Sequence, residues 1–489
     1  MRRDAPPAPV ADRRPPDQAG VPAKALGSRQ PGAARPARPG SPISGYAPPL
    51  VGAAPQARSS SLEWTWQRIA RYGAPLWLAF LALLCVLQTV THAGSRNGFL
   101  ESSRPLYSRY GAPDASASEG YVTWVGTVPV LFDSTSFLTL AAMFLGERGP
   151  EGSGILDHRA AYAYLASLHV PWAGPYWGFL AVNVAFWWGA AAAMWWLVRR
   201  RFGSPPLAYA TSFLVATGNG FIFMAGLPMS YLAAYASMAL LLALAERLQV
   251  FTTGGTLRAW LALGWGGGVA ATLYFAHIPA IIFWWIYGLS RVPWRYLATA
   301  TAVTLAVAAS WMLFGKHVVG LGFATDNTSV LDSAILGWVR HLGEPWTAIV
   351  TYFRFAPVFR TLLGAFPWPW WPLATAGLLA SQRDEREWLM AVIMAGLIPT
   401  VVILSLLPLS RASYYMYPAV YVLAARGALV LGRATGRLAA HLALPAPLHR
   451  PAAAAVAALC LAGLAMAGNL DLLGYQHFNA RFHFTPGLE

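Results

Sequence analysis

Charged side chains are scarce in this sequence: Asp, Glu, Lys and Arg make up 11% of its 489 residues, against about 25% in an average soluble protein. Hydrophobic residues account for 56% and the mean hydropathy is +0.45. A soluble domain could not cover so much apolar surface with so few charges. The composition therefore excludes an ordinary soluble enzyme and indicates an integral membrane protein.

Cysteine is nearly absent as well. The two cysteines, Cys85 and Cys460, lie inside apolar runs, so their number excludes a disulfide framework or a thiolate metal site. The sequence also lacks a phosphate-loop motif, His-Glu-x-x-His and Gly-x-Ser-x-Gly. Carboxylates in the middle of apolar runs are missing too, which counts against an ion-coupled transporter or channel.

Long apolar runs dominate the rest of the chain, each near the roughly 20 residues needed to cross a bilayer. Backbone groups in hydrocarbon must be satisfied within the segment, so these runs predict helices. We expect an all-α, polytopic protein of about eleven spans. They lie at about 75–93, 175–198, 206–225, 229–247, 258–276, 278–290, 296–314, 361–380, 388–408, 413–432 and 451–468.

The net charge of +15 could suggest a nucleic-acid partner, but its distribution points elsewhere. With the N-terminus inside, the inner connections carry 15 arginines and five acids, a net charge of +10. The outer segments carry 11 basic and 12 acidic residues, a net charge of −1. This asymmetry follows the positive-inside rule. We expect a cytoplasmic N-terminus, a C-terminus on the other side and no nucleic-acid partner.

Three regions differ in composition. Residues 1–60 hold 13 prolines and nine basic residues, which predicts a disordered cytoplasmic tail. Residues 61–468 form the predicted membrane domain, and 469–489 an outer C-terminal tail. Outer loops 94–174 and 315–360 are too long for simple connectors, so they are predicted to be functional. Their short apolar stretches, 136–145, 160–168 and 347–355, are typical of interfacial helices.

Seven acids lie in the first outer loop, and two of them open apolar stretches. Asp157 precedes the stretch 160–168, where it could simply cap a helix. Asp133 lies in Val-Pro-Val-Leu-Phe-Asp-Ser, where apolar neighbours would hold its carboxylate near the lipid boundary. Such a carboxylate is costly without a partner or a function, so Asp133 is the first candidate for a catalytic acid or base.

Several stretches together resemble the GT-C class of polytopic membrane glycosyltransferases. They are Phe132-Asp133-Ser134, the segment from His158-Arg159 to Tyr164-Leu165, Asn183, the basic cluster Arg199-Arg200-Arg201, and Ser410-Arg411 to Tyr417-Pro418. The resemblance covers about residues 75–432, by layout more than by identity. It departs from the class in two ways: the first loop has no adjacent pair of acids, and about forty residues separate the first span from Asp133.

The resemblance implies sugar transfer from a polyprenyl-phosphate donor to a glycan, lipid or protein acceptor, outside a bacterial cytoplasmic membrane. Asp133 would be the general base, with Asp157 or Glu101 assisting through an acceptor hydroxyl or a divalent cation (Mg²⁺ or Mn²⁺); because Glu101 is nearer the first span, the choice of base stays open. Arginine suits a departing phosphate. Candidate substrate-binding residues are Arg159, His158, Arg411, Tyr414, Tyr415, Lys316, Arg340 and His341.

Two other functions remain open from the sequence. A polymerase or ligase of lipid-linked glycans would use the second outer loop, and substitution of Arg340 and His341 would then abolish activity. A non-catalytic lipid transporter or scaffold would instead need a continuous polar path through the spans, which the sequence does not display. Arg411 and Lys316 also have a structural interpretation, because basic residues beside aromatic ones commonly anchor helices at the membrane interface.

Overall fold

The computed structural model describes residues 73–91, 122–125, 128–147, 159–274, 276–319, 366, 368–404 and 414–474. For residues 122–136 it describes the backbone alone. The predicted N-terminal tail, 1–60, lies outside these ranges. So do the part of the predicted C-terminal tail that follows Gly474 and most of the two outer loops.

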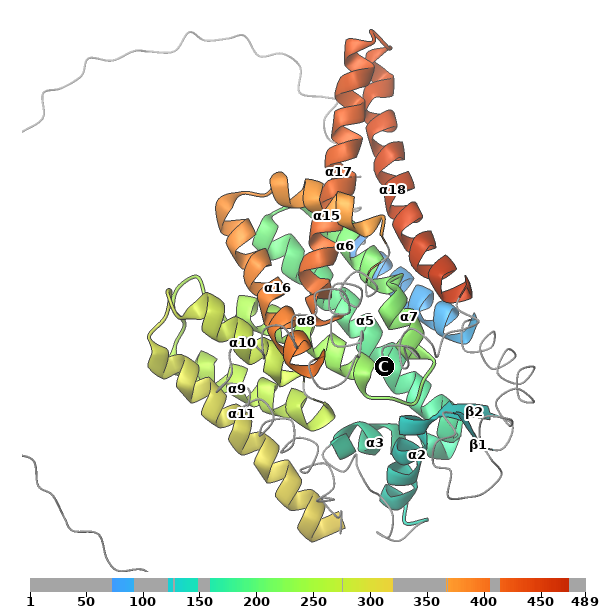
Figure 1. Ribbon diagram of the computed structural model, residues 1–489, viewed down its shortest axis with the longest axis vertical. Helices are drawn as coiled ribbons and strands as arrows, with labels where there is room; N and C mark the ends of the chain where they lie inside the picture. The colour runs from blue at the N-terminus through green and yellow to red at the C-terminus, as the bar shows by residue number, and fades with distance from the viewer. Residues whose placement is uncertain are drawn as a thin grey trace, which may run out of the picture. The chain divides into compact units, whose positions relative to one another are not determined.

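Helices dominate these ranges, and every predicted span contains one (Figure 1). They are Gly73–Thr91, α5 (Pro175–Phe202), α6 (Pro205–Ala216) with α7 (Asn219–Ala225), α8 (Tyr231–Arg247), α9 (Leu257–Leu273), α10 (His277–Gly288), α11 (Trp294–Phe314), α15 (Trp370–Leu379), α16 (Arg383–Leu404), α17 (Tyr417–His441) and α18 (Ala446–Gly474). Five helices are long and apolar enough to cross a membrane: Gly73–Thr91, Pro175–Phe202, Trp294–His317, Tyr414–His441 and Ala446–Ala467. The predicted helical, polytopic membrane fold is confirmed.

The first outer loop contributes a small structure of its own. Strands β1 (Val122–Val125) and β2 (Val128–Leu131) form an antiparallel hairpin, with Val122 opposite Leu131. This hairpin, which the sequence analysis did not predict, leads directly into α2 (Phe132–Phe144). Helix α3 (Ala160–Ser167) and the single turn α4 (Val170–Ala173) follow. The stretches 136–145 and 160–168 are thus helical as predicted, and 347–355 lies outside the described residues.

The predicted span 206–225 is broken into α6 and α7 at Thr217 and Gly218. Tyrosines from elsewhere in the bundle approach the backbone closely at this break. A side chain at Gly218 would collide with the Tyr421 hydroxyl, and one at Gly220 would collide with the Tyr414 ring. The glycines of Gly218-Asn219-Gly220 therefore admit aromatic side chains next to the backbone.

Glycines also set the contact between α9 and α11. A Cβ at Gly264 would lie 2.6 Å from the Ala300 carbonyl oxygen, and one at Gly267 2.7 Å from Thr304 Oγ1. The Thr304 hydroxyl donates to the Gly264 carbonyl at 2.9 Å. Small residues and such hydrogen bonds are how helices associate closely in membranes.

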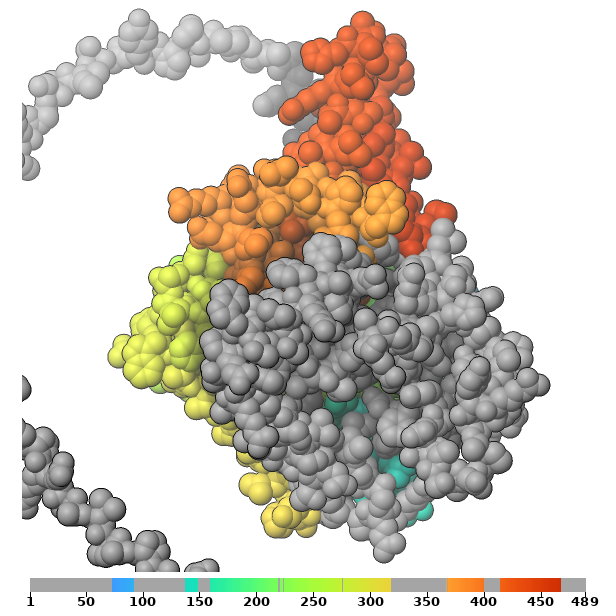
Figure 2. All heavy atoms as spheres, in the orientation of Figure 1, coloured from blue at the N-terminus to red at the C-terminus, as the bar shows by residue number. Residues whose placement is uncertain are grey.

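Helices α17 and α18 pack as an antiparallel pair, joined by a short turn (Figure 1). Both continue past the predicted spans: α17 reaches His441, where the span was predicted to end at 432. In Figure 2 this end of the pair, coloured red, stands clear of α15 and α16, which are orange. The apolar runs thus located the helices but not how far they extend.

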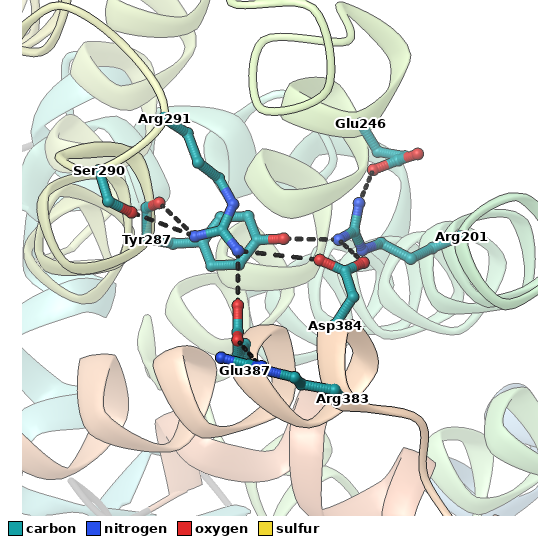
Figure 3. Close-up of polar contacts among 8 residues, drawn as sticks. All are labelled: Arg201, Glu246, Tyr287, Ser290, Arg291, Arg383, Asp384 and Glu387. Carbon is teal, nitrogen blue, oxygen red and sulfur yellow. Dashed lines mark hydrogen bonds and ion pairs between the residues drawn. The ribbon is translucent and has the colours of Figure 1, made fainter.

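Charged side chains from α5, α8 and α16 meet around Arg201, at the end of α5 (Figure 3). The Arg201 guanidinium donates to the Tyr287 hydroxyl at 2.6 Å and lies 3.2 Å from Asp384 and 3.5 Å from Glu246. All the charged members were assigned from the sequence to one membrane face, and the structure brings them together.

Arg291, just beyond α10, extends this group of charged residues. We call the group the inner cluster, because the charge count assigned its members to the inner face. Its guanidinium lies 2.7 Å from Glu387 and stacks 4.0 Å above the ring centroid of Tyr287. The ends of α5, α8 and α10 and the start of α16 therefore share one end of the bundle. This agreement supports the relative directions of the spans that were deduced by counting charges.

A second ion pair at this end joins α16 to α17. The Arg426 guanidinium donates to Glu385 and to the Ser381 hydroxyl, each at 2.5 Å. Partial burial acts to raise the pKa of Glu385, but hydrogen bonds from Arg426 and from the Gln382 backbone, with the nearby positive charges, hold the pKa below its ordinary value of 4.5.

Acid should therefore destabilise this end of the protein. A carboxylate with a lowered folded-state pKa stabilises the fold above its unfolded pKa and loses that contribution as pH falls through the folded-state value. We expect the unfolding temperature of the purified protein in detergent to fall as the pH is lowered below the ordinary glutamate pKa of 4.5 and through the lower folded-state value. In Glu385→Gln the same titration should show a shallower fall, and an unchanged slope would contradict this role for Glu385.

Candidate functional site

Tyrosines gather at the opposite end of the bundle, where α8 begins and α9 ends. We call Tyr231, Tyr235, Tyr274, Tyr414 and Tyr415 the tyrosine cluster. Tyr231 and Tyr274 have ring centroids 5.0 Å apart, and Tyr235 lies 5.1 Å from Tyr414 and 5.5 Å from Tyr415. Along α8, Tyr231 precedes Glu246 of the inner cluster by 15 residues, about 22 Å of helix.

A positive charge is held against this cluster. Arg159, immediately before α3, places its guanidinium carbon 4.2 Å from the Tyr274 ring centroid and 5.8 Å from that of Tyr231. Cations are attracted to the faces of aromatic rings, more strongly where water is excluded. The arrangement holds a guanidinium beside aromatic rings at this end of the bundle, and a guanidinium is a group that binds anions.

Two adjacent tyrosines play different roles here. The Tyr414 hydroxyl accepts a hydrogen bond from the Gly220 backbone at 2.9 Å and shares another with Tyr421, so it holds the start of α7. Tyr415 is 4% exposed, and its hydroxyl lies within electrostatic range of Arg159. That hydroxyl has no hydrogen-bond partner in the part of the chain that the structure describes.

A further buried polar atom next to the cluster, the hydroxyl oxygen of Ser230, which precedes Tyr231, has no hydrogen-bond partner within the described ranges. An unsatisfied buried polar group costs about 1–3 kcal/mol, so such a group is a candidate for binding a polar ligand. With the Tyr415 hydroxyl, it provides hydrogen-bonding capacity at the tyrosine cluster.

Helix α2, which carries Asp133, packs against α3. Asp133 is the second residue of α2, and the structure describes its backbone but not its side chain. One turn later, Phe137 meets the ring of Tyr162 edge-on, with centroids 5.1 Å apart. Asp133 and Arg159 are therefore carried by two helices in direct contact.

An apolar groove of about 780 Å³ begins beside α3 and runs between α8, α9 and α11. Its lining includes Ala161 and Leu165 of α3, Leu244, Gly266 and Trp311. Ala161 is two residues from Arg159, and Leu273 of the same lining is next to Tyr274. The groove thus reaches the helix that follows Arg159, and its mostly apolar lining is suited to a hydrocarbon chain.

The predicted site residues fall into three groups. Arg159, Tyr414 and Tyr415 are brought together, although they are more than 250 residues apart in the sequence. Lys316 is exposed in a π-helical turn, Gly315–Val319, that follows α11. Glu101, Asp157, His158, Arg340, His341 and Arg411 lie outside the described residues.

Sequence reasoning missed Tyr231 and Tyr274 as site residues. Tyrosines inside apolar runs look like ordinary core, and both belong to predicted spans. A usable signal was present, however: Tyr231 starts one span and Tyr274 ends the next, so the predicted topology puts them on the same side as Arg159. The divalent-cation prediction is untested, and within the described ranges no three His, Cys, Asp or Glu side chains come together.

Comparisons with known proteins give only distant similarity. No protein-family model matches the chain, and no curated protein matches it. ArnT from Cupriavidus metallidurans is 15% identical, with a TM-score of 0.42 over 70% of this chain and 72% of that one. The Archaeoglobus fulgidus oligosaccharyltransferase is 14% identical, with a TM-score of 0.48 over 82% of this chain and 56% of that one. The distant resemblance expected from the sequence is found, and similarity at this level assigns no activity to the chain.

Proposed function

We propose that the protein is a membrane glycosyltransferase that takes a sugar from a polyprenyl-phosphate donor. The observation that carries the proposal is a guanidinium and a buried hydroxyl at one end of the bundle, with an apolar groove lined by the helix that follows the guanidinium. Arg159 lies over the Tyr274 ring, the Tyr415 hydroxyl has no partner among the described residues, and the groove begins two residues away at Ala161. A lipid phosphate has matching parts: a charged head and an isoprenoid chain.

The phosphate is assigned to Arg159 and Tyr415. A guanidinium presents several N–H donors to phosphate oxygens, and charge-assisted hydrogen bonds are about twice as strong as neutral ones. These bonds strengthen as negative charge develops on the departing phosphate, which is how a fixed cation lowers a reaction barrier. Tyr415 adds a hydroxyl donor, while Tyr414 keeps its structural contacts to Gly220 and Tyr421.

The isoprenoid chain is assigned to the groove between α8, α9 and α11. The groove has a volume of about 780 Å³ and a mostly apolar lining. The hydroxyls of Ser237, Thr272 and Ser310, which also line it, donate to backbone carbonyls of their own helices. Because the chain comes from lipid and not from water, the groove would hold it by close packing and by its shape, without a hydrophobic gain. Chain binding in the groove would thus hold the phosphate next to Arg159.

For the chemistry, Asp133 is assigned as general base, with Asp157 and Glu101 as the alternatives. The carboxylate takes the proton of an acceptor hydroxyl, and the acceptor oxygen bonds to the anomeric carbon. The bond from that carbon to the phosphate oxygen breaks, and its electron pair leaves on the polyprenyl phosphate. Attack opposite the leaving group inverts the anomeric carbon.

The charge distribution supports a location for this reaction. The inner cluster around Arg201 belongs to the arginine-rich face, which the positive-inside rule makes cytoplasmic. The tyrosine cluster lies at the other end of α8. We therefore assign the site to the non-cytoplasmic side of a bacterial cytoplasmic membrane, with a cytoplasmic N-terminus and a C-terminus outside.

A comparison of lipid-linked with nucleotide-linked sugar donors tests the proposal directly. The purified protein should transfer sugar from polyprenyl-phosphate sugars to a mixed pool of lipid, glycan and peptide acceptors, releasing polyprenyl phosphate. Nucleotide sugars should give no transfer, since they lack a chain for the groove. Transfer from the nucleotide sugar, or none from any lipid donor, would contradict the proposed donor.

Narrowing the groove should discriminate between donors by chain length. Gly266 lines the groove, and its Cβ would lie 3.0 Å from the end of the Leu244 side chain. We expect Gly266→Leu to raise the KM for a long-chain donor about tenfold, equivalent to about 1.4 kcal/mol, and to leave a two-unit analogue unaffected. Gly189→Leu, whose side chain enters open space on α5, is the matched control. Equal KM changes for both chain lengths would exclude the groove as the chain site.

A further inference from the structure

A buried hydrogen-bonded pair, Tyr162 and Asn183, connects the parts of the proposed site. Tyr162 lies on α3, three residues after Arg159, and Asn183 lies on α5. The Tyr162 hydroxyl donates to Oδ1 of Asn183 at 2.7 Å, and both side chains are fully buried. This bond fixes the start of α3, and with it the origin of the Arg159 side chain, against α5.

The other half of the Asn183 amide holds a second part of the site. Its Nδ2 donates to the carbonyls of Met224, Ala225 and Leu227, at 3.2, 3.1 and 2.6 Å. These carbonyls form the turn between α7 and α8, which leads to Tyr231. One amide thus contacts both the helix that follows Arg159 and the turn that carries its aromatic neighbour.

Tyr162 makes a third connection through its ring. It packs edge-on against Phe137 of α2, one turn after Asp133, and lies 5.4 Å from the ring of Phe179 on α5. The pair therefore joins the carrier of the proposed base to the carrier of the proposed phosphate-binding cation.

Polar groups at these positions need an explanation, because the surroundings are apolar. Burying an amide and a hydroxyl is unfavourable unless their hydrogen bonds are made. Apolar side chains could hold α3 against α5 in several registers, whereas an amide with these fixed partners is satisfied in one arrangement. The polar pair therefore specifies the register of α3 against α5, whereas apolar packing alone would only bring the two helices into contact.

We infer that Tyr162 and Asn183 are positioning residues that set the distance between Arg159, Tyr231 and the helix of Asp133. The inference rests on the function proposed above. It predicts that breaking the pair weakens recognition of the donor phosphate more than binding of the chain, because neither side chain lines the groove and α3 supplies three of its lining residues, Ala161, Tyr164 and Leu165.

The test compares two ligands that differ only in the phosphate: polyprenyl phosphate and the matching polyprenol. In Tyr162→Phe, which removes one oxygen, we expect binding of polyprenyl phosphate to weaken about 10- to 100-fold, as for small misplacements of binding groups. Polyprenol binding should weaken less than about twofold, because most of the groove is lined by α8, α9 and α11. Asn183→Ala should act in the same way. If Asn183→Ala fails to fold, the binding of the two ligands to Tyr162→Phe is the test of the positioning role.

Trp187→Phe is the matched control. It removes another buried hydrogen bond from α5, from Trp187 Nε1 to the Val215 carbonyl at 2.8 Å, that does not involve α3. Both ligands should bind this variant as they bind the wild type. If Tyr162→Phe keeps the wild-type preference for the phosphate, or weakens both ligands equally, the positioning role is wrong. If the wild type itself does not bind polyprenyl phosphate more tightly than polyprenol, the proposed function is wrong, whatever the variants show.

Discussion

Replacing Asp133 by Asn should lower kcat for sugar transfer about 100- to 10,000-fold, the usual contribution of a general base. The amide cannot take the proton of the acceptor hydroxyl, so the attack on the anomeric carbon must proceed without that assistance. The donor makes its charged contact elsewhere, at Arg159, so we expect its dissociation constant to change by less than about twofold, because binding and proton transfer are separate steps. Single-turnover kinetics with a polyprenyl-phosphate sugar measure both quantities.

The same assay decides among the three candidate carboxylates. Asp157→Asn and Glu101→Gln should reduce kcat less than Asp133→Asn if Asp133 is the base. A kcat near the wild-type value in Asp133→Asn, together with a collapse in either of the others, would move the role to that residue. Thermal unfolding of each purified variant checks that the loss is not a loss of folded protein.

Replacing Arg159 by Gln should act on binding and on catalysis together. A hydrogen bond to a charged group contributes about 1.5–3 kcal/mol, which corresponds to about 10- to 100-fold in affinity. We expect polyprenyl phosphate to bind weaker by that factor, and kcat to fall as well, because the lost cation also stabilises the departing phosphate. Arg159→Lys should recover part of the affinity, since lysine keeps the charge but not the planar fork.

Arg199 provides a control of similar chemistry. It also stacks on an aromatic ring, with its guanidinium carbon 5.4 Å from the Trp195 ring centroid, but at the inner end of α5. Arg199→Gln should leave donor affinity and kcat unchanged. If both arginine variants weaken donor binding equally, the effect arises from net charge and the assignment of Arg159 is wrong.

Much of the fold was predictable because hydrocarbon imposes strong constraints on sequence. Each of the eleven predicted apolar runs contains a helix in the part of the chain that the structure describes, and the side chains of Arg201, Glu246 and Asp384 meet where the charge count put them. What the runs do not encode is where a helix breaks or ends. At the break, Gly218 lies against Tyr421, about two hundred residues away, and no local pattern reveals that contact.

The candidate site was predictable only in part, for a related reason. Arg159 and Tyr415 stood out because polar groups are rare in these segments. The different roles of Tyr414 and Tyr415 could not be read from two adjacent tyrosines, since the Gly220 backbone decides which hydroxyl is occupied. Asn183 was noticed as part of a resemblance, but its partners in α3 and in the turn before α8 required the structure.

A cryo-electron microscopy structure of the full chain with bound polyprenyl phosphate tests the account most directly. The phosphate should lie within hydrogen-bonding distance of the Arg159 guanidinium and the Tyr415 hydroxyl. Its isoprenoid chain should follow the groove past Ala161 toward Gly266. A phosphate bound beside Arg340 and His341, or at the arginine-rich inner face, would contradict the assignment of the tyrosine cluster as the donor site.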